Sequence, residues 1–346
     1  MKALVFEATN EPMKVREFPD PQCPPHGAIV RVEGSGICRS DWHLWQGDWS
    51  WIGFAFPLPM VLGHEYTGVV EEVGKEVQTF KKGDRVVMPP NHACGACAEC
   101  RRGASNLCFA GGTFMGGYGR YVPVAHADFN MMRLNDQIDF IEAAAMGCRY
   151  ITAYHGVLDQ GQVKADDSVV IYGCGGVGLS AVQIAAAAGA QVIAVDLDDQ
   201  KLALAKKVGA EHVINAKNTD PVGAVRELTH GGADVAVDAL GIATTCRNGI
   251  MSLRKQGRHV QIGLTTQQEK GEVSLPIDMM VLSEIQFVGS ASMQTSRYPA
   301  MLGMVARKKI SPKALVTEII PIEKAFGVIE QMSKFQNVGM SVVNEF

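Results

Sequence analysis

Short apolar stretches, interrupted by glycine and proline, dominate the first 130 residues of the chain. Brief strands that end at turn residues are typical of a β-rich lobe. The strands predicted here cover residues 3–7, 28–34, 67–73, 85–88 and 119–124. This pattern predicts an all-β, barrel-like first domain.

The periodicity changes near residue 137. Residues 138–145 and 150–158 carry apolar side chains at helical spacing, and apolar runs then alternate with helical stretches such as 178–188 and 199–208. The runs predicted as strands are residues 168–172, 191–195, 212–214, 235–238, 260–263 and 286–290. Six strands separated by helices predict a doubly wound parallel sheet in an α/β domain.

The segment after residue 290 contains helical and extended pieces, among them residues 298–307 and 322–335. It is too small to fold alone. We therefore expect residues 291–346 to return to the first domain, residues 1–149, with the α/β domain of residues 150–290 inserted between them.

Composition and charge narrow the class of protein. A chain of 346 residues with 47% hydrophobic and 20% charged residues fits two soluble globular domains. A net charge of −4 without long basic runs gives no electrostatic reason to expect nucleic acid or a membrane as partner. No apolar run is long enough to span a membrane, and residues 1–7 lack a signal-peptide core, so we expect a cytoplasmic protein with reduced cysteines.

Four cysteines lie within one short loop: Cys94, Cys97, Cys100 and Cys108. Four thiolates at this spacing are typical of a structural zinc site, because a tetrahedral zinc ion neutralises them and accepts all four sulfurs. The alternatives are unrelated reduced thiols or two disulfides.

A glycine-rich turn follows the predicted strand of residues 168–172. It contains Gly173, Gly175, Gly176 and Gly178, in the G-x-G-x-x-G pattern, and precedes a helix. Such glycines let the backbone approach a pyrophosphate at a helix N-terminus. The pattern predicts a dinucleotide site, and the alternative is a purely structural tight turn.

Acidic residues near the end of the next strand indicate which dinucleotide binds. Asp196 can accept hydrogen bonds from a ribose 2′-hydroxyl and would repel a 2′-phosphate, and Asp198 and Asp199 add to the repulsion. This favours NAD over NADP. Lys201 can reach the same ribose, although a solvated surface lysine fits its position equally well.

Three further cysteine and histidine positions are unremarkable alone: Cys38, His64 and Cys148. Together with the cysteine loop and the glycine turn, they resemble the zinc-dependent medium-chain alcohol dehydrogenases over essentially the whole chain. The resemblance includes the signature Gly63-His64-Glu65-x2-Gly68-x5-Gly74-x2-Val77. It implies a GroES-like β-barrel catalytic domain with an inserted Rossmann domain.

The resemblance also implies a catalytic zinc ion bound by Cys38, His64 and Cys148, with a fourth position for water or the substrate oxygen, and therefore two zinc ions per chain. Glu65 matches a transient or outer ligand of that zinc, and Asp41 matches a residue that orients the histidine ligand. The alternative for both acids is a structural salt bridge.

Family positions imply roles for residues around the reaction centre. Ser40 and His43 match a proton relay, for which an imidazole is well suited near pH 7. Arg39 matches a pyrophosphate-binding residue, and Thr152 and Val177 match positions that back the nicotinamide ring.

Three apolar residues at the ends of later strands are weaker cofactor candidates: Leu240, Ile262 and Leu264. Simple core packing is their alternative. The chain also departs from many relatives at Met340, where a basic residue would contact the pyrophosphate.

The aromatic content around the first ligands suggests the substrate. All four tryptophans lie between residues 42 and 51, with two phenylalanines close behind. Their surfaces favour an apolar medium-chain, cyclic or aromatic alcohol, although most of them can instead pack the lobe. The pocket residues we select are Trp49, Asn91 and His92.

The sequence thus predicts an NAD-dependent zinc enzyme that interconverts an alcohol and an aldehyde or ketone. The resemblance to family members of this length implies a homotetramer, with a dimer as the alternative. A polyol or amino-alcohol dehydrogenase on the same scaffold is the nearest alternative, and a cysteine as third ligand argues against it. A zinc-free reductase and a non-catalytic cofactor-binding protein are more distant alternatives.

Overall fold

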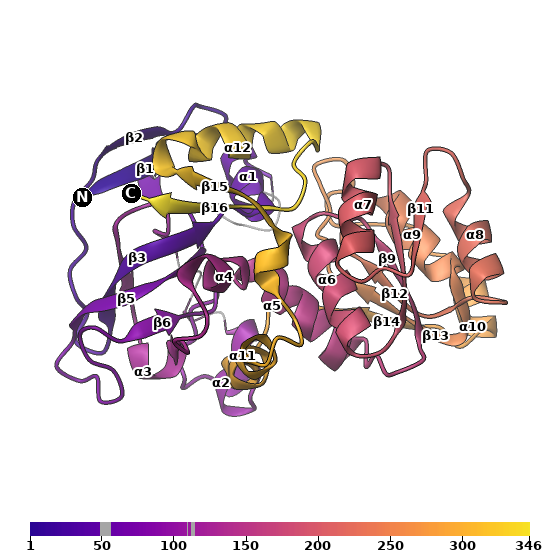
Figure 1. Ribbon diagram of the computed structural model, residues 1–346, viewed down its shortest axis with the longest axis horizontal. Coiled ribbons are helices and arrows are strands. Elements are labelled where there is room, and N and C mark those ends of the chain that lie inside the picture. Colours follow the sequence, from indigo (N-terminus) through magenta and orange to yellow (C-terminus); the bar gives the residue numbers. More distant parts are fainter. Residues whose placement is uncertain (49–56, 109, 112–114) are drawn as a thin grey trace. The chain divides into compact units, whose positions relative to one another are not determined.

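The computed structural model describes residues 1–48, 57–108, 110–111 and 115–346 (Figure 1). The chain forms two compact units. Unit 1 contains Met1–Arg149 and Ser292–Phe346, and unit 2 contains Tyr150–Ala291. Unit 1 is therefore built from both ends of the chain, and unit 2 from one continuous segment.

Unit 1 is dominated by antiparallel pairing. Its larger sheet has the order β15-β16-β3-β5-β6-β8, with β7 paired to β3, and its smaller sheet has the order β2-β1-β4. The strands are β1 (Lys2–Phe6), β2 (Lys14–Glu17), β3 (Ala28–Gly36), β4 (Met60–Val61), β5 (Glu65–Val73), β6 (Arg85–Val87), β7 (Tyr121–Val124), β8 (Met132–Arg133), β15 (Val316–Pro321) and β16 (Met340–Glu345).

Alternating side chains of β3 place one of its faces in the core. Ala28, Val30 and Val32 are fully buried and pack in one cluster with residues of β5, β6 and β7. The backbones of β3 and β5 come very close at Gly68, where an added Cβ would lie 2.0 Å from the carbonyl oxygen of Arg31. Glycine is therefore required there.

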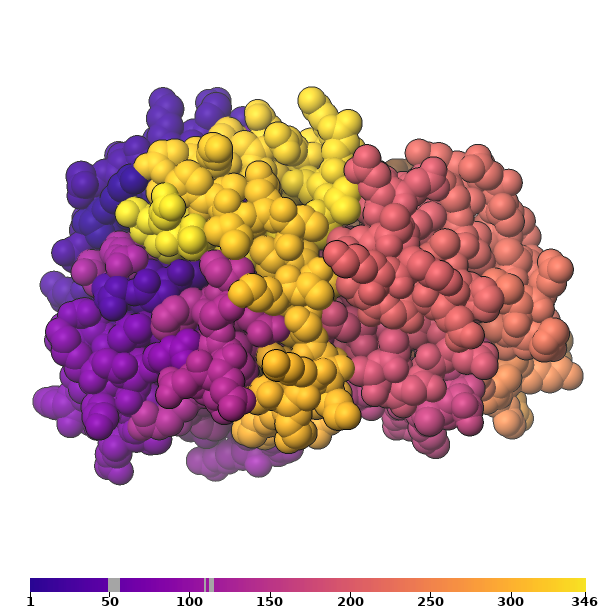
Figure 2. Space-filling model, in the orientation of Figure 1, coloured from indigo at the N-terminus to yellow at the C-terminus, as the bar shows by residue number. Residues whose placement is uncertain are grey.

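The C-terminal segment completes this sheet. Strand β16 pairs with β15 on one side and with β3 on the other, and the amide of Ile37 donates to the carbonyl of Ser341 at 3.0 Å. Figure 2 shows the yellow C-terminal residues packed over the indigo N-terminal part of the same unit. This pairing fixes the backbone directly before Cys38.

The helices of unit 1 are short. They are α1 (Arg39–Gln46), α2 (Ala98–Arg101), η2 (Ser105–Leu107), α3 (Ala127–Asn130), α4 (Phe140–Ala145), η4 (Thr295–Arg297), α11 (Tyr298–Ala306), η5 (Pro312–Leu315), η6 (Ile322–Lys324), α12 (Ala325–Gln331) and η7 (Met332–Lys334). Helix α5 (Cys148–Tyr154) begins at the last residues of the first segment of this unit.

Unit 2 is a six-stranded parallel sheet with the order β11-β10-β9-β12-β13-β14. Its strands are β9 (Ser168–Tyr172), β10 (Gln191–Asp196), β11 (His212–Asn215), β12 (Ala233–Asp238), β13 (Leu253–Gln261) and β14 (Gln286–Gly289). The chain starts in the middle, moves to one edge and returns to build the other half. This is the doubly wound order of dinucleotide-binding domains, and with the sheets of unit 1 it confirms the predicted fold class.

Helices connect the strands of this sheet. They are α6 (Gly176–Ala187), α7 (Asp199–Lys207), α8 (Pro221–Leu228), α9 (Ala243–Met251) and α10 (Ile277–Leu282), while η3 (His155–Gln160) precedes the first strand, β9. Because each parallel connection needs a crossover, helices are the expected linkers.

Several element boundaries differ from those predicted. Strand β13 begins at Leu253, well before the predicted start at residue 260. The prediction missed its first half because these residues are largely exposed and form no apolar run. Within residues 322–335, the helical pieces are η6, α12 and η7. In the part of the chain that the structure describes, no helix has the length and apolar character needed to cross a bilayer.

Candidate active site

Three ligand atoms converge in unit 1. One atom each of Cys38, His64 and Cys148 lies within 4.8 Å of the others. Cys38 and His64 are buried, and Cys148 is partly exposed. Two thiols and an imidazole at these separations form a set that can hold one metal ion, with room for a fourth ligand in a tetrahedral arrangement.

Strand pairing explains how residues distant in sequence meet here. Gly36 of β3 is paired with Glu65 of β5, so Cys38 follows the end of one strand while His64 precedes the start of its neighbour. Cys148 is the first residue of α5. The hydrogen bond with Cys148 lowers the pKa of Cys38, which is buried beside it.

Asp41 fixes the orientation of the His64 ring. Its Oδ1 atom lies 3.1 Å from Nδ1 of His64 and also accepts from the amide of Gly63, while Oδ2 accepts from Cys38 N and, at 2.6 Å, from Tyr118 Oη. The opposite nitrogen, His64 Nε2, is buried and has no hydrogen-bond partner among the described residues. A buried nitrogen without a partner is costly unless it binds something else, which fits a metal ligand.

Glu65 does not belong to this three-ligand cluster. Its carboxylate is buried and forms an ion pair with Arg149, the residue after Cys148. The structure thus places Glu65 in a salt bridge, which was one of the two interpretations of its sequence position.

Ser40 and His43 lie three residues apart on α1, so they share one face of this helix. The Sγ atom of Cys38 lies 3.6 Å from Oγ of Ser40, which places this hydroxyl beside the cluster. Nδ1 of His43 lies 2.7 Å from Oδ2 of Asp48. Burial lowers the pKa of His43, and Asp48 partly offsets this effect.

Arg39 lies between two aromatic rings. Its guanidinium carbon is 4.4 Å from the centre of the Trp42 ring and 4.0 Å from that of Phe335, and Nη1 donates to the carbonyl of Met332 at 2.9 Å. Nη2 is buried without a hydrogen-bond partner among the described residues. The guanidinium is thus held by contacts within unit 1.

The four cysteines of the loop also form a cluster, with Sγ atoms within 4.8 Å of one another. None of the nine cysteines forms a disulfide. Backbone amides of Ala96 and Cys97 donate to Cys94 Sγ and lower its pKa to about 6. Amides that point at a sulfur stabilise the thiolate, which is the metal-binding form.

The glycine-rich turn lies between β9 and α6 of unit 2. Gly173 has φ +92°, and a Cβ at Gly178 would lie 1.7 Å from the carbonyl oxygen of Gly173. Gly175 is the N-cap of α6, whose first residues are Gly176 and Val177. The glycines are required to close the turn, and they leave the N-terminus of α6 without side chains over it.

Asp196 is the last residue of β10. Its carboxylate accepts hydrogen bonds from the backbone amides of Cys174, Leu197 and Asp198, at 2.6, 2.7 and 3.0 Å. It therefore also holds the glycine turn in place. Lys201 is buried in α7 and is not a solvated surface lysine.

The remaining cofactor candidates of unit 2 occupy different environments. Thr152 and Ile262 are buried, and the amides of Ile262 and Leu240 donate to the carbonyl and the carboxylate of Asp238, respectively. Leu264 is 56% exposed, so it is not packed in the core.

The structure describes two of the three predicted substrate-pocket residues. Trp49 lies outside the described residues. The side-chain amide of Asn91 donates to the carbonyl of Asn106 at 2.9 Å, which ties it to the cysteine loop. The ring centres of His92 and His126 are 6.0 Å apart.

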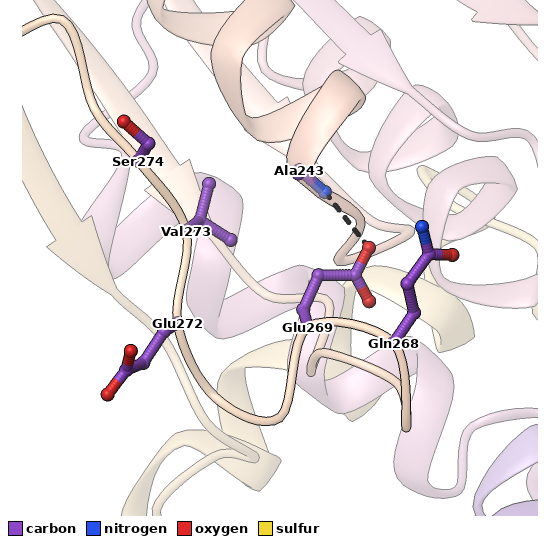
Figure 3. A pocket seen from close by; sticks show the side chains of 6 residues that line it. All are labelled: Ala243, Gln268, Glu269, Glu272, Val273 and Ser274. Atoms are coloured by element: carbon purple, nitrogen blue, oxygen red, sulfur yellow. Dashed lines mark hydrogen bonds between the residues drawn. The ribbon is translucent and has the colours of Figure 1, made fainter.

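A shallow pocket of about 630 Å³ lies in unit 2, lined by Ala243, Gln268, Glu269, Glu272, Val273 and Ser274 (Figure 3). None of these six residues is a predicted site residue. The Glu269 carboxylate accepts from the amide of Ala243 at 3.4 Å and from Thr266 Oγ1 at 2.6 Å, so it ties the loop to the start of α9.

Sequence reasoning missed three residues around the three-ligand cluster: Asp48, Tyr118 and Arg149. Arg149 carried a detectable signal, because it is the only charged residue between Ala143 and Tyr154. Asp48 and Tyr118 belong to no recognisable motif, and only the fold brings them to His43 and Asp41.

Comparison with known proteins gives consistent matches over both units. Residues 24–136 match the alcohol dehydrogenase GroES-like domain family, and residues 176–307 match the zinc-binding dehydrogenase family.

Relatives at similar identity cover almost the whole chain. An NAD-dependent alcohol dehydrogenase of Sulfurisphaera tokodaii is 33% identical, covering 99% of each chain. A sorbitol dehydrogenase of Halalkalibacterium halodurans is 32% identical, covering 95% of this chain and 96% of that one. The solved alcohol dehydrogenase of Thermus sp. ATN1 superposes with a TM-score of 0.90 at 32% identity, with all of both chains covered.

The two family matches account for most of the described fold, and the relatives extend this likeness to both ends of the chain. Together with the predicted signature around His64, they establish that this chain belongs to the zinc-dependent medium-chain alcohol dehydrogenase family.

Proposed function

We propose that the protein is an NAD-dependent zinc alcohol dehydrogenase that interconverts an apolar alcohol and its aldehyde or ketone. The convergence of Cys38, His64 and Cys148 supports this proposal most strongly. Relatives with the same chain length include NAD-dependent alcohol dehydrogenases, which favours the same class of reaction here.

The three-ligand cluster suits zinc. Two sulfurs and one imidazole are ligands that zinc accepts at catalytic sites, where a fourth position stays open. The buried Nε2 atom of His64 has no other partner among the described residues, and Asp41 holds the ring by its other nitrogen. Zinc bound there would act as a Lewis acid toward the oxygen of the substrate.

Within this proposal, two residues of α1 transfer the proton of the alcohol. The hydroxyl of Ser40 would accept this proton beside the cluster, and the His43 imidazole on the same helix face would carry it toward solvent. Asp48 holds the imidazole by Nδ1 and so orients it for this transfer.

NAD would bind through the glycine turn and Asp196, and it would supply the hydride acceptor. The N-terminus of α6 would receive the pyrophosphate. From its family position, we also propose Arg39 as a pyrophosphate-binding residue. Asp196 would receive the ribose hydroxyls and disfavour a 2′-phosphate.

The cysteine loop would hold a second, structural zinc ion, giving two per chain. The convergence of four sulfurs and the amide–sulfur bonds at Cys94 support this role. Four protein ligands close such a site, so it would stabilise the loop and not take part in the reaction.

The proposed substrate class is inferred from the residues near the three-ligand cluster. Cys148 as third ligand and the aromatic residues around α1 favour an apolar alcohol. The sorbitol dehydrogenase relative keeps a polyol as the second candidate. We also propose a homotetramer, with a dimer as the alternative.

One experiment tests these points together. Purified protein is assayed for NADH formation with 1-hexanol, cyclohexanol, benzyl alcohol, sorbitol and threonine, while zinc per chain and the mass in solution are measured. Activity on the first three alcohols with two zinc ions supports the proposal. Turnover of sorbitol alone supports the polyol alternative, and no turnover with zinc absent contradicts both.

A further inference from the structure

Glu65 is held by a single residue. Both oxygens of its carboxylate lie 3.0 Å from Nε of Arg149, Nη2 of Arg149 donates to Oε2, and the backbone amide of Arg149 donates to Oε1 at 2.9 Å. Both side chains are buried, with 0% and 7% of their surfaces exposed. Each hydrogen bond described for this carboxylate therefore comes from the residue that follows Cys148.

Two glycines make room for this pair. A Cβ at Gly36 would lie 2.3 Å from Oε2 of Glu65 and 2.9 Å from Nη2 of Arg149. A Cβ at Gly147 would lie 2.4 Å from the Cβ of Glu65. The absence of side chains at Gly36 and Gly147 thus leaves space for the ion pair.

The Glu65–Arg149 ion pair affects the net charge next to the three-ligand cluster. In the proposed site, two thiolates balance a divalent ion, and His64 is neutral. A carboxylate at the adjacent position would add a negative charge and a possible oxygen ligand, and both would weaken the ion as a Lewis acid. The guanidinium of Arg149 cancels that charge and occupies the carboxylate oxygens.

We propose that Arg149 is a positioning residue that keeps the Glu65 carboxylate off the metal bound by Cys38, His64 and Cys148. The inference rests on the proposed metal site and concerns this chain's own residues. It assigns Glu65 as an outer residue, against the expectation from sequence that it serves as a transient ligand. The bidentate geometry requires arginine, since lysine cannot present two parallel donors.

The test uses cobalt(II) in place of zinc. Cobalt reports its ligands through visible absorption bands, which lose intensity as the number of ligands rises from four to five. Four full-length proteins are compared: the unchanged chain, Glu65→Gln, Arg149→Met and the double variant. The cysteine loop is identical in all four, so difference spectra report the three-ligand cluster alone.

The expected result has three parts. Glu65→Gln leaves the spectrum unchanged, because Glu65 does not contact the metal. Arg149→Met loses band intensity, because the released carboxylate reaches the metal. The double variant regains the original intensity, since glutamine is a poor ligand.

Other results overturn the inference. A spectral change in Glu65→Gln alone shows that Glu65 already binds the metal. An unchanged Arg149→Met spectrum, or a change that persists in the double variant, shows that Arg149 has only a packing role. If Arg149→Met does not fold, Arg149→Lys replaces it, because lysine keeps the positive charge but cannot hold both carboxylate oxygens, and a loss of band intensity is again expected.

Two controls separate this inference from the proposed function. Arg133→Met removes another arginine of unit 1, paired with Asp84 at 2.7 Å, and leaves the spectrum unchanged if the effect is specific to Arg149. Cobalt bound only by the four-cysteine loop in all proteins refutes the metal site itself, and the inference with it.

Discussion

Nδ1 of His43 lies 2.7 Å from Oδ2 of Asp48, and both side chains are buried. Gly47 makes this contact possible, because its left-handed conformation ends α1 and lets the amide of Asp48 donate to the carbonyl of His43. The turn that terminates the helix therefore also supplies the partner of the proposed relay imidazole.

Asp48→Asn tests this pair through pH. Burial lowers the pKa of His43 and the Asp48 charge partly raises it, so removing the charge lowers this pKa further. The acid limb of the kcat/KM profile for alcohol oxidation is expected to move to lower pH, together with a slower rate at pH 7. An acid limb that stays in place or moves to higher pH contradicts the role of Asp48.

Ser40→Ala tests the hydroxyl beside the cluster. We expect turnover to fall by about 10²–10⁴-fold, the usual contribution of proton transfer, while zinc content and NAD affinity stay the same. Ser35→Ala is a matched control, because Ser35 is a buried serine of the same unit whose hydroxyl has no hydrogen-bond partner among the described residues. Equal turnover in Ser40→Ala and the unchanged enzyme removes Ser40 from the mechanism.

Asp196→Ala tests cofactor selection. The ratio of kcat/KM for NADP to that for NAD should rise at least about tenfold, equivalent to about 1.4 kcal/mol. Some stability should also be lost, because Asp196 accepts three backbone amides. Asp220→Ala is the control, since Asp220 caps α8 through the amides of Val222 and Gly223 and has no proposed role in cofactor binding. A similar ratio in both variants means that the ribose lies elsewhere.

Asn130→Ala tests the support of the cysteine loop. The buried amide of Asn130 donates to the carbonyls of Ala93, Ala125 and His126 and accepts from the amide of Ala93. Leaving these groups unpaired should lower the free energy of unfolding by roughly 1–3 kcal/mol, measured by urea unfolding, and should speed loss of zinc to a chelator. Asn135→Ala, at an exposed turn, should do neither.

Acid stability depends on His92. Burial and the neighbouring His126 lower its pKa to about 4, so between pH 4 and 6.5 the folded chain binds fewer protons than the unfolded chain. Stability therefore falls as pH decreases through this window. His92→Gln should reduce that loss by about 1–2 kcal/mol once solvent screening is allowed for. An unchanged slope of unfolding free energy against pH in His92→Gln contradicts this role.

The sequence predicted unit 2 best. Apolar runs such as Val169, Val170 and Ile171 are buried on both faces of a parallel sheet, so hydrophobicity alone marks them. Strand β13 was placed only in part, because residues 254–256 are polar and exposed and lie in an irregularity between its paired residues Leu253 and Arg258.

The candidate site was predicted where residues belong to motifs. Cys38, His64 and Cys148 came from the family resemblance, and the structure brings their ligand atoms together. Arg149 could be noticed as the only charged residue of an apolar stretch, but the sequence does not show which residue it pairs with. Its pairing with Glu65 depends on the register of β5 and the start of α5.

The split construction of unit 1 has a consequence for biosynthesis. All six strands of unit 2 emerge from the ribosome as one uninterrupted stretch, so this unit can fold while translation continues. Strand β16, which pairs with β3 close to Cys38, is translated only after all of unit 2. The first segment of unit 1 therefore lacks this strand until translation has passed unit 2.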